Sequence, residues 1–155
     1  MKPQGRLLLT IRDERGEVVA TRAAKNRVLR GGAEVIAGLF AGTRDVPIDK
    51  VLLGFGQATI DPTSDKLTPP PMSDIPAAAL EAPLAKEHFT VRPGDGQVTV
   101  DVAAPLTPSQ NIDGVSEAGL VSGDVLYNQV IFEPVNLRTG QVVTFFWQID
   151  FPFGQ

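Results

Sequence analysis

Alternation of apolar and polar side chains marks two hairpins in the chain. Residues 97–103 place a valine at every second position, and a Pro-Gly-Asp-Gly turn at 93–96 separates them from the extended stretch 86–92. Alternation with period two is typical of a half-buried strand, so these residues predict a hairpin. Residues 6–12 and 17–23 alternate more weakly around a polar turn that ends in glycine, and they predict a second hairpin.

The densest β-forming stretch is at the end of the chain. Residues 125–132 and 141–151 are rich in β-branched and aromatic side chains, and residues 133–140 between them contain Pro134, Asn136 and Gly140. We therefore expect these two strands to pair as a hairpin with a longer loop. One face of the last strand is entirely apolar, as in a strand that lines a sandwich core, and it consists of Phe145, Trp147, Ile149 and Phe151.

Only residues 26–40 have helical periodicity. Their apolar stripe, which we expect to pack on a sheet, consists of Leu29, Ala33, Ile36, Ala37 and Phe40, and Gly42 follows as a C-terminal cap. Gly31 and Gly32 lower the helix propensity but allow close approach to a neighbouring element. They lack the continuation of a phosphate-binding loop, so packing is favoured over anion binding.

With further strands at residues 48–56 and 115–121, the chain has roughly seven or eight strands and one short helix. The predicted fold is therefore an all-β, antiparallel β-sandwich, jelly-roll-like, formed by residues 1–155 as a single domain. The 15 glycines and 13 prolines agree with short elements joined by turns.

Residues 57–83 form a proline-rich segment with few β-branched residues. A loop of this length inside a small domain is unusual and is often functional. Prolines pre-order the chain, so we expect an interaction arm that is mobile in the isolated protein and ordered in an assembly. The residues predicted to contact a partner are Leu67, Pro69, Pro70, Pro71, Met72, Ile75, Leu80 and Leu84.

Charge and cysteine content narrow the function classes. The formal net charge of -4 gives no overall attraction to nucleic acid or to an anionic membrane. Basic residues gather near the start of the chain, where a solvated face or a protected strand edge is favoured over a ligand site: Arg6, Arg12, Arg15, Arg22, Lys25, Arg27 and Arg30. The absence of cysteine excludes thiolate chemistry, and neither a signal peptide nor a membrane helix is apparent, so we expect a soluble protein not exported by a signal peptide.

Catalytic and metal-binding residues are not evident. His88 is the sole histidine and has neither a second histidine nor a cysteine to share a metal with, so a functional role is disfavoured. Residues 61–65 lack the spacing of a calcium loop and predict a plain turn. Two carboxylates that meet in the fold could act as general acid and base. The four candidates for such a pair are expected to be ordinary surface groups instead: Asp113, Glu117, Glu133 and Asp150. We expect no enzyme activity, no cofactor and no metal.

Several short motifs resemble small β-sandwich proteins of tailed-phage virions and contractile injection machines. They are Asn26 with Gly31-Gly32, the strand 48–56, Glu117-Ala-Gly-Leu120, and the closing Phe132-x-Pro134, Gly140 and Phe146-Trp-Gln-Ile149, and together they span residues 26–151. The resemblance implies a tail, baseplate, fibre-attachment or capsid-associated component that acts by assembly. The proline-rich segment departs from that pattern.

Two main functions follow from these observations, and a small hydrolase, which only the scattered carboxylates would support, ranks third. The leading hypothesis is a structural assembly protein of a phage-like particle, located in the virion after assembly in the host cytoplasm, with other virion proteins and copies of itself as partners. The alternative is a carbohydrate- or receptor-binding module, which needs exposed aromatic side chains. Trp147 and Tyr127 are the candidates for such a platform, although aromatic residues on core strands are more often simply core.

Overall fold

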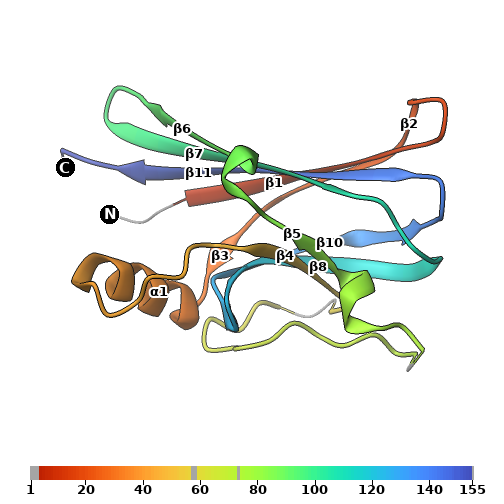
Figure 1. Ribbon diagram of the computed structural model, residues 1–155, viewed down its shortest axis with the longest axis horizontal. Coiled ribbons are helices and arrows are strands. Elements are labelled where there is room, and N and C mark those ends of the chain that lie inside the picture. Colours follow the sequence, from red (N-terminus) through yellow and green to blue (C-terminus); the bar gives the residue numbers. More distant parts are fainter. Residues whose placement is uncertain (1–3, 57–58, 73, 155) are drawn as a thin grey trace.

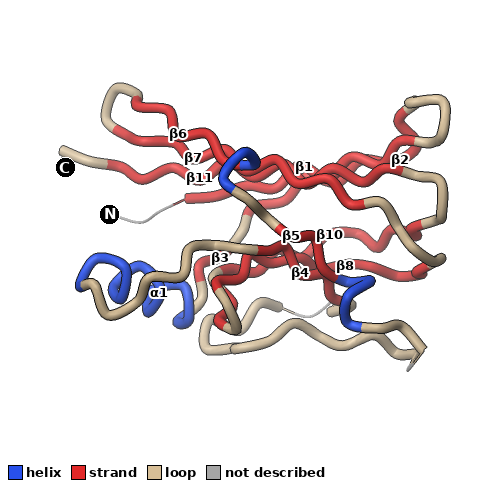
Figure 2. The backbone as a smooth tube through the Cα atoms, in the orientation of Figure 1, coloured by secondary structure: helices blue, strands red, loops and turns tan. Residues whose placement is uncertain are grey.

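The computed structural model describes residues 4–56, 59–72 and 74–154, and in it strands predominate (Figures 1 and 2). Strands account for 51% of the residues and helices for 13%. The elements are, in order, β1 Gln4–Arg12, β2 Val18–Lys25, β3 Arg27–Val28, α1 Arg30–Ala41, β4 Lys50–Gly54, the 3-10 helix η1 Ala77–Leu80, β5 Glu81–Pro83, the 3-10 helix η2 Lys86–His88, β6 Phe89–Pro93, β7 Gln97–Leu106, β8 Ile112–Ser122, β9 Val125–Leu126, β10 Asn128–Leu137 and β11 Val142–Pro152.

Two antiparallel sheets pack face to face, as the sequence predicts for a β-sandwich. The first sheet has the strand order β2-β1-β11-β7-β6, and the second has the order β3-β10-β8-β4-β5, with β9 paired to β8. Alternate residues of β11 point inward, and Phe145 and Trp147 are both fully buried. The apolar face predicted for the last strand is therefore confirmed, and it forms the centre of the core.

The two hairpins predicted from alternation are confirmed. β1 pairs with β2 across the turn at 13–16, and β6 pairs with β7 across the turn at 94–96. The first strand of the second hairpin starts at Phe89, because residues 86–88 form a 3-10 helix. Turn residues and local alternation act over short distances, which is why both hairpins are visible in the sequence.

The predicted C-terminal hairpin is wrong. β10 and β11 follow one another in the chain but belong to different sheets: β10 pairs with β8 and β3, whereas β11 pairs with β1 and β7. β10 also continues to Leu137, past Pro134, so the connection from β10 to β11 consists of residues 138–141 only. Both strands bury an apolar face in the same core. Two strands can do this from opposite sheets of a sandwich as well as from neighbouring positions in one sheet, so burial does not decide the pairing.

The helix begins later than predicted and turns a different face to the protein. α1 starts at Arg30, and Gly42 caps its end with a left-handed φ of 74°. Its buried residues are Gly32 and Val35, whereas Ile36 is 38% exposed and Phe40 is 94% exposed. The predicted stripe through Ile36 and Phe40 is therefore wrong. The helix approaches with its small residues instead, since a Cβ on Gly31 would lie 2.7 Å from the carbonyl oxygen of Leu126.

The outer faces of the two sheets differ. Segment 59–72 lies on the outer side of the second sheet, where Leu29 and Leu67 form a small cluster with Val121 and Leu126, and α1 lies at one end of that sheet beside β9 and β3 (Figure 1). β8 is consequently buried on both faces from Val115 to Ser122. No described helix or strand lies over the outer face of the first sheet (Figure 1). That face therefore remains available to other molecules.

Candidate functional site

The predicted interaction arm packs in part on its own chain. Leu67, Ile75 and Leu80 are buried, with exposed fractions of 7%, 9% and 7%. The sequence predicts that these three side chains contact a partner. The structure corrects this, because they are already buried within their own chain. Leu84 and Pro70 are half-buried, and Pro69, Pro71 and Met72 are exposed. Among the eight residues predicted to contact a partner, the three exposed ones lie between the anchors Leu67 and Ile75.

A buried carboxylate holds the arm against the second sheet. Glu117 on β8 is 1% exposed, and its Oε1 accepts hydrogen bonds from the backbone N–H of Thr68 at 2.6 Å and of Gly56 at 3.1 Å. The side chain of Gln129 on β10 donates to the other oxygen of the same carboxylate. Glycine at position 56 is required here, since a Cβ would lie 2.7 Å from Glu117 Oε2. We call these contacts the Glu117 clasp.

The start of the arm is an ordinary turn. The Asp61 carboxylate accepts hydrogen bonds from the backbone N–H and the hydroxyl of Thr63 at 2.9 and 2.8 Å, and these bonds lower its pKa. The backbone N–H of Arg30 donates to the carbonyl of Pro62 at 2.8 Å. The plain turn predicted for residues 61–65 agrees with this geometry. The hydrogen bond from Arg30 also satisfies one of the backbone N–H groups at the start of α1. This N–H, next to the Gly31-Gly32 pair, is therefore not free to bind an anion.

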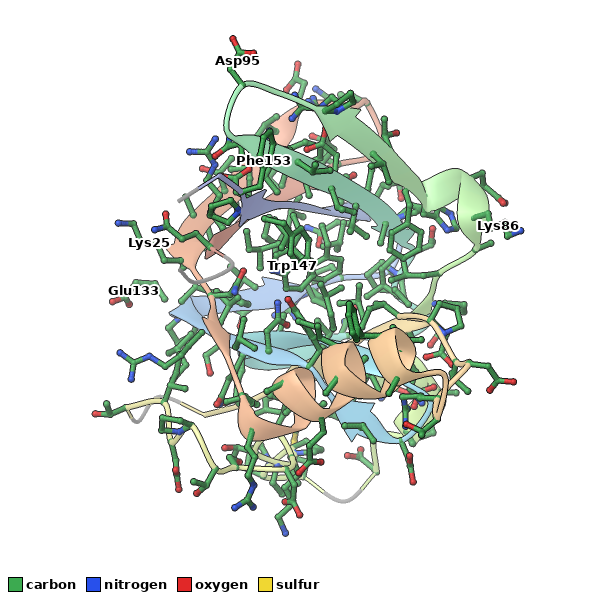
Figure 3. All side chains as sticks on the ribbon, turned by 90° about the vertical axis from the view of Figure 1, so that its left-hand side faces the viewer. Lys25, Lys86, Asp95, Glu133, Trp147 and Phe153 are labelled. Atoms are coloured by element: carbon green, nitrogen blue, oxygen red, sulfur yellow. The ribbon has the colours of Figure 1, made fainter. Side chains whose placement is uncertain are left out.

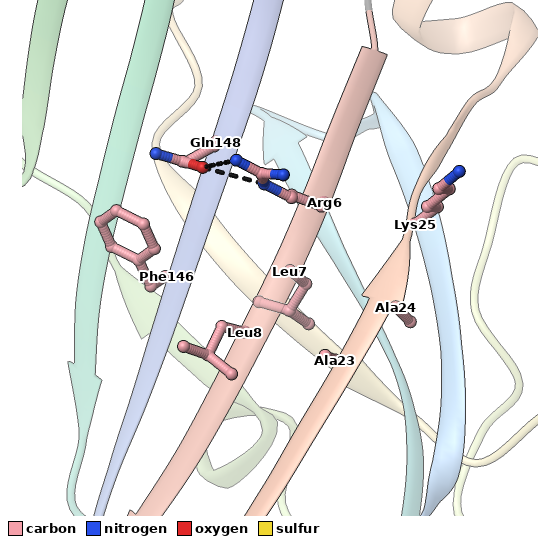
Figure 4. Close-up of a pocket in the computed structure, with 8 residues that line it drawn as sticks. All are labelled: Arg6, Leu7, Leu8, Ala23, Ala24, Lys25, Phe146 and Gln148. Atoms are coloured by element: carbon pink, nitrogen blue, oxygen red, sulfur yellow. Dashed lines mark hydrogen bonds between the residues drawn. The ribbon is translucent and has the colours of Figure 1, made fainter.

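The uncovered face of the first sheet carries a row of apolar side chains. Leu8 lies opposite Ala23 of β2 on one side and opposite Phe146 of β11 on the other, and Phe146 in turn lies opposite Ala103 of β7. Leu8 is 45% exposed. Leu8, Ala23 and Phe146 line a shallow hollow of about 440 Å³ (Figure 4). A continuous apolar row on an outer sheet face is a feature of interaction surfaces.

A second, polar hollow of about 830 Å³ adjoins the first at the end of the sheet. Both hollows share Arg6, Lys25 and Gln148, and the second is also lined by Arg27 and Asp150. The Arg6 guanidinium donates to the side-chain oxygen of Gln148, a neutral partner that leaves the positive charge uncompensated (Figure 4). Within the described residues none of the three cations forms an ion pair. Three cations and one carboxylate give this region a formal charge of about +2. We call the two hollows together the basic groove.

The other N-terminal basic side chains differ in their roles. Arg22 reaches from the edge strand β2 across to β10 and donates to the backbone carbonyls of Glu133 and Pro134 at 2.9 and 3.1 Å. It therefore joins the two sheets at one edge of the sandwich. Arg12 donates to the carbonyl of Gly16 within its own turn at 2.9 Å. The expectation of a charged strand edge fits β2, which ends the first sheet.

The outward side of α1 is a second apolar surface. Ile36, Leu39 and Phe40 are 38%, 43% and 94% exposed. Their spacing places them on one side of the helix, in its C-terminal half, whereas the buried Gly32 and Val35 lie in its N-terminal half. We call these three residues the helix stripe. Ile36 and Phe40, which the periodicity predicts to pack on a sheet, thus face solvent instead.

The residues considered for catalysis have separate structural roles. His88 lies in η2, not in a strand, and its Nδ1 accepts the backbone N–H of Ala85 at 2.8 Å. Asp113 forms an ion pair with Arg138 at 2.7 Å, and Asp150 accepts from the hydroxyl of Thr99 at 2.7 Å. Glu133 projects from the periphery (Figure 3). Glu117 is the exception to the expected surface position, because the clasp buries it.

The two aromatic residues considered for a sugar platform lie inside the protein. Trp147 is fully buried at the centre of the sandwich (Figure 3). Tyr127 is 4% exposed. Burial raises the pKa of Tyr127 to about 12. Stacking on a sugar ring requires an accessible aromatic face, so this pair cannot supply a carbohydrate platform.

Neither a metal-binding cluster nor a membrane-spanning helix occurs in the described ranges. No group of three or more His, Asp or Glu side chains there lies close enough to hold a metal ion. In the same part of the chain, no helix has the length and apolarity needed to cross a membrane.

The uncovered sheet face has a signal in the sequence, whereas the clasp has none. Leu7-Leu-Leu9 and Phe145-Phe-Trp147 are both runs of three apolar residues, so the middle residue of each must point to the outer face of its strand. The sequence pattern alone therefore indicates an apolar outer face at Leu8 and Phe146. No comparable local signal distinguishes Glu117 from a surface carboxylate, since its partners come from residues 56, 68 and 129.

Comparison of the chain with protein-family models, with curated proteins and with solved structures finds no match.

Proposed function

We propose that the protein is a structural assembly component of a phage-like particle, such as a tail, baseplate, fibre-attachment or capsid-associated protein. The observation that carries the proposal is the helix stripe, in which Phe40 is 94% exposed beside Leu39 and Ile36. Leaving large apolar side chains in water is unfavourable, and clusters of them mark protein contacts. The uncovered apolar row of the first sheet offers a second contact surface.

The positions of the carboxylates and aromatic residues considered for other functions also support the proposal. The candidates for acid/base chemistry point to different partners, and the aromatic residues of the carbohydrate alternative are buried. An assembly protein needs neither feature. The resemblance of residues 26–151 to small virion β-sandwiches supports the choice of particle, and the virion is the location that we propose.

The test is incorporation of variants into particles purified from the source organism. Phe40→Asp changes an exposed side chain, so the variant should keep its thermal midpoint and yet be depleted from the particles at least about tenfold. Asp95→Lys, at the exposed tip of the β6–β7 turn, is the control and should be incorporated normally. Recovery of the wild-type chain only outside the particles would overturn the proposal.

A further inference from the structure

We infer that the basic groove binds exposed residues of the arm, those between Leu67 and Ile75, from a second copy of the same chain. This inference rests on the proposed function and names the partner of one of its surfaces. Four exposed residues of the arm lie between the anchors Leu67 and Ile75, and we call them the arm tip: Pro69, Pro71, Met72 and Asp74.

The groove offers hydrogen-bond donors beside an apolar floor. Arg6, Lys25 and Arg27 carry only donors, and Leu8 and Phe146 form the adjoining apolar surface. A ligand that fits must therefore be rich in acceptors, carry negative charge and present one apolar side chain. A nucleic-acid backbone would fill the cationic part but leave the apolar floor exposed.

The arm tip has the complementary chemistry. Prolines keep their backbone carbonyl but have no N–H, so the run 69–71 is a backbone of acceptors without donors. Met72 is 45% exposed and is an adaptable apolar side chain. Asp74 is exposed and supplies the negative charge. The whole segment 57–83 contains four carboxylates and one lysine, opposite in sign to the groove.

The arm tip is held in place from both sides. Leu67 is buried in the cluster with Leu29, and Ile75 belongs to the main core. Thr68 is bound by the Glu117 clasp at 2.6 Å. These anchors present the tip on the surface before binding, which lowers the entropy that association must overcome.

A chain cannot fill its own groove. The groove lies near the start of β1, and the arm tip lies at the opposite end of the longest axis of the molecule (Figure 1). A contact between them must therefore join two copies, and each copy contributes one tip and one groove. Such head-to-tail contacts build rings or open filaments.

Cross-linking between single-cysteine variants tests the inference, and the native chain contains no cysteine to interfere. Leu8→Cys in one copy and Met72→Cys in another are mixed and treated with a short bismaleimide. The mixed dimer should form at least about tenfold more than in the matched mixture of Val91→Cys with Met72→Cys, because Val91 is 64% exposed on the far edge strand of the same sheet.

Charge exchange gives an independent readout of the same contact. Lys25→Glu and Asp74→Lys should each reduce the mixed dimer several-fold, and the pair of variants combined should restore it. Arg15→Glu and Asp95→Lys, which change the charge by the same amounts elsewhere, should have no effect.

Equal cross-linking in the Leu8 and Val91 mixtures, both in solution and inside the particle, would overturn the inference. If the chain were still a stoichiometric part of the particle, the proposed function would stand and the groove would belong to another protein. A chain absent from the particles would instead contradict the proposed function.

Discussion

The two sheets of the sandwich share one core but differ on their outer faces. In the second sheet, β8 is buried on both sides, because the segment held by the Glu117 clasp passes over its outer side. In the first sheet, β11 alternates between buried and half-buried positions, and its outer side chains meet solvent. The outer face of the second sheet is covered by the chain itself, so its side chains contribute to the stability of the fold. The outer face of the first sheet has no such cover among the described residues, and under the proposed function it is a surface for assembly.

The largest effect is expected at the clasp. Glu117→Ala removes the acceptor for two backbone N–H groups and for Gln129, and it should lower the free energy of unfolding by about 3 to 5 kcal/mol. Chemical denaturation measures this loss, and hydrogen exchange should show faster exchange at Thr68. Glu133→Ala is the control at an exposed carboxylate and should change stability by less than about 0.5 kcal/mol. Equal effects of the two substitutions would contradict the clasp.

Neighbouring helix residues should respond very differently to the same change. Val35→Asp places a charge where the side chain is 2% exposed and should cost about 3 to 4 kcal/mol. Ile36→Asp alters an outward position and should cost less than about 1 kcal/mol. Thermal unfolding of both variants checks the orientation of α1. A larger loss for Ile36→Asp would show that the stripe predicted from the sequence is the packed face after all.

Tyr127 should make the protein sensitive to alkali. Its pKa rises from 10 in the unfolded chain to about 12 in the folded protein, so its stabilising contribution is complete below pH 10 and is lost as the pH rises toward 12. The loss amounts to about 2 to 3 kcal/mol. Tyr127→Phe should flatten this decline. At pH 7 it should be close to neutral, because the hydroxyl has no partner among the described residues. Parallel alkaline slopes for both proteins would contradict the assignment.

The smallest effect on stability is expected on the uncovered face. Leu8→Ala should lower the free energy of unfolding by less than about 1 kcal/mol, since the side chain is 45% exposed. Leu9→Ala, the adjacent and fully buried position, should cost about 2 to 5 kcal/mol. Urea denaturation of the pair measures the contrast. Similar losses at both positions would mean that the outer face of the first sheet is not open.

Local features of the fold were predictable and distant pairings were not. The β1–β2 and β6–β7 hairpins follow from alternation and turn residues that lie within a few positions of each other. The separation of β10 and β11 into different sheets does not, because an apolar strand face specifies burial and not the neighbour that it pairs with. The predicted helix face is wrong for a related reason. Gly32 approaches the carbonyl oxygen of Tyr127, and a glycine carries no hydrophobic signal that would reveal this.

In the candidate site too, contacts between residues far apart in the sequence could not be predicted, as the arm and the Glu117 clasp show. The proline content predicts an extended segment, but the burial of Leu67, Ile75 and Leu80 depends on surfaces supplied by residues far away in the sequence. Glu117 has an outward position on β8, as a surface carboxylate would, and becomes buried only because the arm passes over it. The outward positions of the exposed Leu8 and the half-buried Phe146, in contrast, can be predicted from the runs of three apolar residues.

Hydroxyl-radical footprinting of the chain, free and inside the purified particle, tests most directly whether the uncovered sheet face is the one that partners bind. Leu8, Phe146 and Met72 should be oxidised in the free chain and protected several-fold in the particle, whereas the buried Trp147 should stay unmodified in both states. Equal oxidation of Leu8 and Phe146 in the free and the assembled protein would contradict the assignment of this face to assembly.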